Sequence, residues 1–415
     1  MNKTSVFLIL ISLFTIHQQA NSQTKKDVSY LQQVGAIDSL YSQTLQESLN
    51  FYVELPEGYT PDSGKKYPVA YILDGELLLP ALATVLNFYS GGFLPDMVLV
   101  GVSNETHRTR DLTTSAMPGP GGELNSEQGG AEAFYNFLAD ELIPYVEAHY
   151  PVTGYRTLIG HSYGGLFTVN TLLNHPEMFA NYLAIDPSLD WDNRKLLNEA
   201  SQKLETTNYG DKTLFVSLSG QMHLQKPEMT LAEARLDTTD FTGFSRANLT
   251  FNDLLNANPQ NAPQFEWKFY PNDLHGTVPL PSIMDGMISL FEWYQMEDIH
   301  KFNIPETTVA ELDRILTQQA KKLEDHFGYA EPPLPDFLLN MSGYMSMDMD
   351  QPKKAKFYFE QGIKYYPNSA NAYDSLADYY ERTGDKAAAL QAITKAYELN
   401  PDAYYKERME SLKEN

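Results

Sequence analysis

The sequence contains no cysteine among its 415 residues. Disulfide bonds, thiolate metal ligands and a cysteine nucleophile are therefore all excluded. Basic residues are also scarce, since 30 lysines and arginines stand against 54 aspartates and glutamates, for a formal charge of −24. This excess of negative charge argues against binding to nucleic acid or to an anionic membrane surface. The negative charge favours solubility but does not identify a substrate.

The sequence has little in the way of long apolar runs, and the clearest one lies at the N-terminus. Lys3 precedes an apolar stretch from Val6 to Ile16, and Ala20-Asn21-Ser22 offers small residues at the positions a signal peptidase recognises. The run is too short to span a bilayer and has the length of a signal-peptide core. We expect residues 1–22 to be a signal peptide cleaved before Gln23. The mature protein would then be exported, either periplasmic or secreted, and not held in a membrane.

The rest of the sequence predicts a catalytic domain over 23–300, a helical linker over 301–336 and helical repeats over 337–415. In the first part, short apolar runs alternate with helical stretches, which predicts an α/β fold with a mostly parallel sheet covered on both faces. We expect a helix over 131–150. The predicted strands are 67–73, 97–100, 157–159, 182–185, 213–218 and 265–269. Reactive groups collect at the carboxyl ends of such strands, so these ends are where chemistry is expected.

The C-terminal part repeats itself at an interval of 34 residues. Four positions of one copy correspond to four of the next, and their small residues let paired helices pack closely. These pairs are Ala355 with Ala389, Phe359 with Ile393, Gly362 with Ala396, and Pro367 with Pro401. The pattern resembles the tetratricopeptide repeat. The resemblance implies a tail that packs on the catalytic domain or binds a protein partner.

The strongest catalytic motif is Gly160-His161-Ser162-Tyr163-Gly164. A G-x-S-x-G sequence between a predicted strand and a predicted helix is typical of the nucleophile elbow of α/β-hydrolases. The glycines allow a tight turn that exposes the serine, and the helix N-terminus favours developing negative charge. We therefore predict Ser162 as the nucleophile.

A serine nucleophile needs a base, which in this fold follows the last strand. His275 lies six residues beyond Phe269 and is the preferred base. His223 is the alternative, whereas His175 falls in a turn at a helix end. For the oxyanion hole we predict the amide of Tyr163 and an amide from the early turn at Gly75 or Glu76.

The acid that would orient the base remains open at this point. The strand before that of the histidine ends at Ser219-Gly220, and the carboxylates that follow are Glu228, Asp237 and Asp240. A serine and a histidine working without an acid are a further alternative. Asp186, Asp190 and Asp192 match no metal-binding spacing, and we interpret them as a polar turn beside the active site. No metal or cofactor is expected.

Several stretches together resemble the esterase D and enterochelin-esterase-like group of α/β-hydrolases, which includes feruloyl and siderophore esterases. They are 71–75, 108–113, 141–145, 160–166, 187–189 and 275–278. The resemblance supports Ser162, His275 and the turn at Gly75, and it favours Asp237 over Glu228 as the acid. The sequence departs from the family at Gln221, where a glutamate is frequent. It departs again at Asp186-Pro-Ser-Leu-Asp190-Trp191, where the family tends to have Ser-Pro-Ser-Leu-Trp-Trp.

These observations predict an exported serine hydrolase that cleaves a small-molecule carboxylic ester through an acyl-enzyme. An acyltransferase would carry the same motifs. A different class of function, an inactive hydrolase scaffold whose repeat tail binds a protein, is the second hypothesis, and the intact serine and histidine argue against it.

Overall fold

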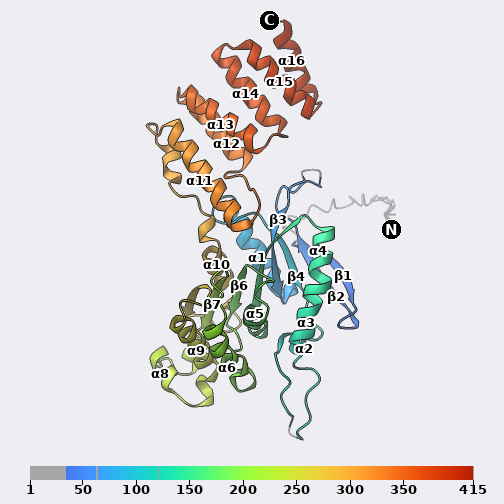
Figure 1. The fold of residues 1–415 in the computed structure, drawn as a ribbon, viewed down its shortest axis with the longest axis vertical. Helices are drawn as coiled ribbons and strands as arrows, with labels where there is room; N and C mark the ends of the chain where they lie inside the picture. The colour runs from blue at the N-terminus through green and yellow to red at the C-terminus, as the bar shows by residue number, and fades with distance from the viewer. Residues whose placement is uncertain (1–33, 62–63, 120, 415) are drawn as a thin grey trace, which may run out of the picture. The chain divides into compact units, whose positions relative to one another are not determined.

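The computed structural model describes residues 34–61, 64–119 and 121–414. The predicted signal peptide over 1–22 lies outside these residues. Within them, eight strands form one mixed sheet in the order β1-β2-β4-β3-β5-β6-β7-β8 (Figure 1). The strands are β1 (Ala36–Ser42), β2 (Glu47–Glu54), β3 (Tyr67–Leu73), β4 (Val98–Val102), β5 (Val152–His161), β6 (Asn181–Ile185), β7 (Thr213–Ser219) and β8 (Gln264–Tyr270).

The sheet is mostly parallel, as the sequence predicts. Neighbouring strands from β4 through β3 to β8 pair in parallel, and only the β1–β2 and β2–β4 pairs are antiparallel. Each of the six predicted strands is present. The hairpin of β1 and β2 at one edge was not predicted. Because the parallel strands share a direction, the residues that follow β5, β6, β7 and β8 all emerge at one edge of the sheet.

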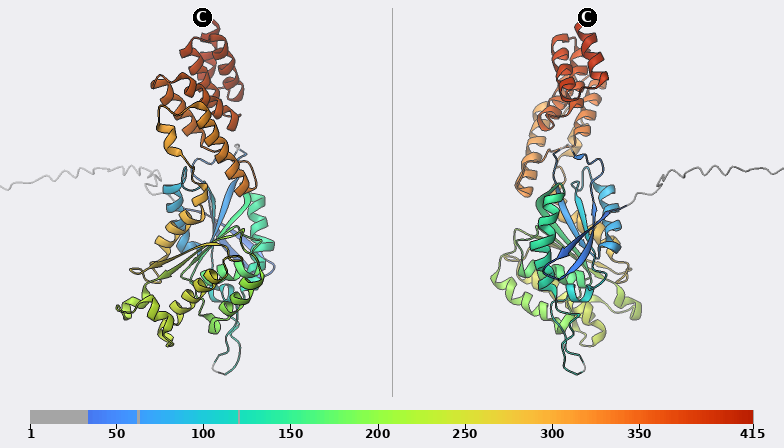
Figure 2. Two further views of the ribbon diagram at one scale, coloured as in Figure 1. Left: turned by 60° about the vertical axis from the view of Figure 1, so that its left-hand side comes forward. Right: turned by 90° about the vertical axis from the view of Figure 1, so that its right-hand side faces the viewer.

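Helices cover both faces of this sheet (Figure 2). Alternate residues of β6 show the two faces: Tyr182 and Ala184 belong to the core that includes Leu166 of α5 (Tyr163–Asn174), whereas Leu183 faces Gly286 of α10 (Pro279–Leu290). The helices of this part are α1 (Gly75–Tyr89), α2 (Arg108–Leu112), α3 (Ala131–Phe137), α4 (Ile143–His149), α5 (Tyr163–Asn174), α6 (Trp191–Thr206), α7 (Gln221–Gln225), α8 (Leu231–Leu236), α9 (Gly243–Ala257) and α10 (Pro279–Leu290).

The helix predicted over 131–150 is present with one irregularity. A π-helical segment, η2 (Leu138–Leu142), joins α3 to α4. Phe134, Leu138, Leu142 and Val146 are buried, so the predicted apolar face is the one that packs. Such wide turns are inserted locally and do not interrupt the path of a helix.

The C-terminal part is helical throughout. It contains α11 (Val309–Phe327), α12 (Asp336–Asp348), α13 (Pro352–Tyr365), α14 (Ala370–Thr383), α15 (Lys386–Leu399) and α16 (Ala403–Glu414). Three short 3-10 helices precede this part: η3 (Asp240–Thr242), η4 (Glu292–Tyr294) and η5 (Ile299–Asn303). The paired small positions of the predicted repeat are buried in corresponding helices, Ala355 in α13 and Ala389 in α15. Leu312 and Leu316 of α11 pack with Leu339 and Phe357 of the repeats.

Candidate active site

Ser162 occupies the turn between β5 and α5. Its backbone has φ 60° and ψ −115°, a conformation that L-residues rarely adopt, and its amide donates to the carbonyl of Ile185 at 3.0 Å. The turn is closed so tightly that a Cβ on Gly160 would lie 2.1 Å from the carbonyl oxygen of Gly164. Glycine is therefore required at Gly160. This geometry is that of a nucleophile elbow, in which backbone strain is kept at the reactive residue.

His275 lies beside the serine, as the sequence predicts. Its Nε2 is 2.9 Å from Ser162 Oγ, and the ring comes from the loop between β8 and α10. The His275 amide donates to Gln221 Oε1 at 2.9 Å, and the amide of Gly220 donates to Asp273 O. The side chain of Gln221 therefore holds the histidine loop by accepting from the backbone amide of His275. The alternative base, His223, instead packs its ring against Phe269.

The carboxylate beside the histidine is Asp186. Its Oδ2 is 2.6 Å from His275 Nδ1, and its Oδ1 accepts from the amide of Ser219 at 2.8 Å. The residue follows β6 directly, has φ 42° and is 0 % exposed. A buried carboxylate at Nδ1 places the ring proton there, which leaves Nε2 free to accept a proton from the serine.

Asp237, the acid favoured from the sequence, is not brought to His275. It ends α8, and its carboxylate accepts from the amide and hydroxyl of Thr239 at 2.8 and 3.0 Å. Glu228 is also absent from the residues that line the site. The carboxylates predicted from the sequence all lie in the loop after β7, whereas the one that contacts His275 comes from the end of the neighbouring strand β6. Asp186 is the first residue after a predicted buried strand, but the sequence alone does not say which strand end lies beside His275.

The predicted oxyanion residues lie on two helix N-termini. Tyr163 begins α5 and lines the cavity, while Gly75 and Glu76 begin α1 and are not among the lining residues. The turn before α1 is nevertheless tied to the elbow. Arg108 donates to both carboxylate oxygens of Asp74, at 2.6 and 2.8 Å, and to the carbonyl of His161 at 3.2 Å. The roles of the three predicted amides remain predictions.

His161, the residue before the serine, has a structural role that the motif alone did not reveal. Its Nε2 lies 2.8 Å from the carbonyl oxygen of His275, so a neutral ring with its proton on Nε2 donates this bond. Burial, reinforced by the charge that His275 can carry, lowers the pKa of His161 to about 4. His161 therefore holds the loop of the base as an uncharged donor at neutral pH.

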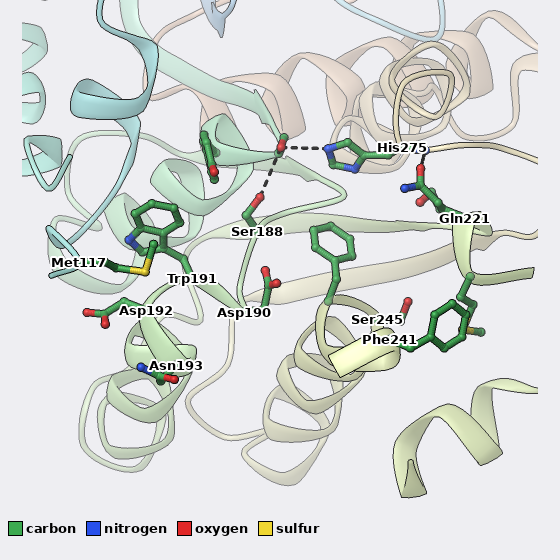
Figure 3. A pocket seen from close by; sticks show the side chains of 15 residues that line it. Met117, Ser188, Asp190, Trp191, Asp192, Asn193, Gln221, Phe241, Ser245 and His275 are labelled. Carbon is green, nitrogen blue, oxygen red and sulfur yellow. Dashed lines mark hydrogen bonds between the residues drawn. The ribbon is translucent and has the colours of Figure 1, made fainter. Parts of the chain in front are cut away.

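Ser162 and His275 line a cavity of about 550 Å³. Figure 3 shows this cavity from close by. Its walls combine apolar and polar side chains, which is typical of a small-molecule site. Beside Ser162, Tyr163 and His275, the lining residues are Met117, Ser188, Asp190, Trp191, Asp192, Asn193, Ser219, Gln221, Met222, Phe241, Phe244 and Ser245. In the part of the chain that the structure describes, no group of three or more His, Asp or Glu side chains is arranged to hold a metal ion.

With this geometry established, comparison with known proteins identifies the two parts of the chain. Residues 42–222 match the family model described as "Putative esterase", and residues 338–369 and 370–403 each match a tetratricopeptide repeat model. The chain carries an esterase-family domain followed by tetratricopeptide repeats. The resemblances noted in the sequence are thereby confirmed.

Several curated relatives of the esterase-family domain are named siderophore esterases. Ferri-bacillibactin esterase of Bacillus subtilis is 30% identical over 190 residues, which are 42% of this chain and 65% of that protein. Siderophore enterobactin esterase of Emericella nidulans is 44% identical over 156 residues, or 33% of this chain and 52% of that protein. The match thus spans between half and two thirds of each relative.

Two solved structures share the fold over most of the chain. An IroE-like serine hydrolase from Shewanella oneidensis superimposes with a TM-score of 0.64 at 26% identity, covering 80% of this chain and 99% of that one. An uncharacterised protein from Capnocytophaga ochracea covers 92% of this chain and 100% of its own, with a TM-score of 0.59 at 18% identity. The second likeness concerns the fold alone.

Proposed function

We propose that this protein is a serine hydrolase that cleaves carboxylic esters through an acyl-enzyme, with Ser162, His275 and Asp186 as its catalytic triad. The observation that carries the proposal is the continuous hydrogen-bond chain from Ser162 Oγ through both nitrogens of His275 to the buried Asp186. The names of the relatives, siderophore esterases and a serine hydrolase, support the same class of chemistry.

The reaction follows from the roles of these groups. His275 Nε2 takes the proton of Ser162 as its oxygen attacks the ester carbonyl. The amide of Tyr163, with an amide of Gly75 or Glu76, stabilises the oxyanion at the helix N-termini. His275 then protonates the leaving alcohol. Water, deprotonated by the same ring, releases the acid and restores the serine. Asp186 stabilises the imidazolium and fixes its tautomer.

Labelling with a fluorophosphonate probe tests the proposal, because the probe reacts only with an activated serine. We expect strong labelling of the parent, none in Ser162→Ala and at least a hundredfold slower labelling in His275→Ala. Ser188→Ala is the control, since its hydroxyl lies 3.3 Å from that of Ser162 and could otherwise be the labelled group. A folded parent that takes no label would contradict the proposal.

Export is a separate part of the proposal and rests on the N-terminal sequence. No helix within the described residues is long and apolar enough to cross a membrane. Expression in a bacterium followed by N-terminal sequencing of the exported fraction should give a chain that begins at Gln23. Recovery of an uncleaved chain from the cytoplasm alone would contradict this part.

A further inference from the structure

Asp190 projects its carboxylate into the cavity that contains the proposed nucleophile. It belongs to the segment after β6 and lines the same cavity as Ser162 and His275 (Figure 3).

The carboxylate of Asp190 has no cationic partner in the part of the chain that the structure describes. None of the residues lining the cavity is lysine or arginine. Arg108 is bonded to Asp74 at 2.6 Å, and Lys226 lies over the ring of Phe241, 4.7 Å from its centroid. Arg194, which follows Asp190 in the same segment, is exposed and is not among the residues that line the cavity. Asp192, by contrast, accepts from Ser115 Oγ at 2.6 Å. Asp190 is thus the carboxylate of the cavity left for a substrate.

The protein atoms around Asp190 disfavour its charge. Although its side chain is accessible through the cavity, desolvation raises the pKa of Asp190, and only its own backbone and the charge of His275 oppose this effect. A cationic group bound beside the carboxylate would supply the missing partner, whereas an anionic group would add repulsion.

The segment that carries Asp190 is held in an unusual conformation. Asp192, Asn193 and Arg194 have φ of 47°, 52° and 64°, three consecutive left-handed residues without a glycine. The indole of Trp191 donates to Ser115 O at 3.0 Å and helps to fix the turn. Strain of this kind persists only where the surrounding structure enforces it, and it is concentrated at ligand sites.

We propose that Asp190 determines substrate selectivity: it favours esters that carry a positive charge, such as an ammonium group, next to the scissile bond, and disfavours anionic ones. The inference rests on the proposed hydrolase function and specifies its substrate class. Asp190 contacts the substrate and takes no part in the proton transfers.

Three thioesters with one acyl group test the charge preference directly. The butanoyl thioesters of thiocholine, 3,3-dimethylbutanethiol and 2-mercaptoethanesulfonate are closely similar in shape and carry a positive, no and a negative charge. Their hydrolysis can be followed with a thiol reagent, which meets no cysteine in this protein. At low ionic strength we expect kcat/KM to fall in the order cation, neutral, anion, with at least tenfold between the extremes.

The decisive quantity is the ratio of kcat/KM for the cationic and anionic thioesters within each variant, because it cancels any general loss of activity. Asp190→Asn should reduce this ratio about tenfold, while Glu407→Gln, which removes an exposed carboxylate of α16 outside the cavity, should leave it unchanged within about twofold. Two results would overturn the role of Asp190 and leave the hydrolase proposal standing. One is a parent that hydrolyses all three thioesters with equal kcat/KM, and the other is an equal reduction of the cation-to-anion ratio in both variants. A parent that hydrolyses none of the three and takes no fluorophosphonate would overturn the hydrolase proposal itself.

Discussion

At the scale of single residues, the proposed triad makes the action of His275 as a base depend on Asp186, which bonds its Nδ1 at 2.6 Å. Asparagine at this position would offer an amide where Nδ1–H needs an acceptor, or would force the ring into the other tautomer. We expect Asp186→Asn to lower kcat/KM for a nitrophenyl ester by about 10⁴-fold, the loss typical of such a change in a serine triad. Asp237→Asn should change it less than twofold, because the Asp237 carboxylate accepts from Thr239 and does not reach His275.

The same pair of variants separates the prediction from general damage to the fold. Thermal unfolding monitored by circular dichroism should show both variants folded at the assay temperature. A large loss in Asp237→Asn together with full activity in Asp186→Asn would show that the acid is the one favoured from the sequence and that the hydrogen bond of Asp186 is structural.

His161 should make the stability of the protein depend on pH. Its pKa is lowered from 6.5 to about 4, so between these values the unfolded chain binds a proton that the folded chain does not. Stability therefore rises with pH through this window and is lost as the pH falls, by up to about 3 kcal/mol at pH 4. Urea unfolding at pH 7 and pH 4.5 should show a smaller loss in His161→Gln than in the parent.

Glutamine suits this test because its amide can still donate to the carbonyl of His275. His300→Gln, at an exposed histidine, is the matched control and should lose as much stability as the parent. An equal loss in all three proteins would mean that other groups cause the acid sensitivity.

At the scale of elements, two glycines each begin a helix, but one is closely packed and the other has open space beside it. A Cβ on Gly75 of α1 would lie 2.3 Å from the carbonyl carbon of Gly101 in β4, whereas one on Gly243 of α9 would meet nothing within 4 Å. We expect Gly75→Ala to cost more than about 2 kcal/mol through overpacking, and Gly243→Ala to be neutral or stabilising by about 0.5–1 kcal/mol. Urea unfolding of both variants measures this, and equal effects would contradict the close packing of α1 on β4.

The sequence predicts those features that depend on neighbouring residues and does not predict those that depend on which strands lie side by side. Ser162 and His275 could be found because each follows a recognisable strand in the order that the fold requires. Asp186 could not be chosen, because which strand end supplies the acid depends on how β6 and β7 lie side by side. The hairpin β1–β2 was missed because it lies at the sheet edge, where half-exposed residues give no continuous apolar run.

At the scale of the whole molecule, α11 connects the esterase-family domain to the repeats. Near its N-terminus, Leu312 packs with the repeat helices. The ring of its last residue, Phe327, packs against Tyr155 of β5 and against Trp293, with ring centroids 5.0 and 5.1 Å apart. Only 7% of Phe327 is exposed. The sequence predicts a helical linker over 301–336, and α11 within it contacts the repeat helices at one end and the aromatic rings of Tyr155 and Trp293 at the other.

This packing predicts how the chain should respond to shortening. A chain that ends at Pro335 keeps α11 and every residue that lines the cavity, so its rate of fluorophosphonate labelling should stay within twofold of the parent. In the full chain, Phe327→Ala should lower the free energy of unfolding by about 3–5 kcal/mol, because a cavity would replace a buried ring. Labelling rates and urea unfolding of the two proteins provide the measurements. If the shortened chain is folded but takes no label, the repeats contribute directly to the active site. If it labels at the parental rate, the repeats are an accessory that the proposed active site does not need.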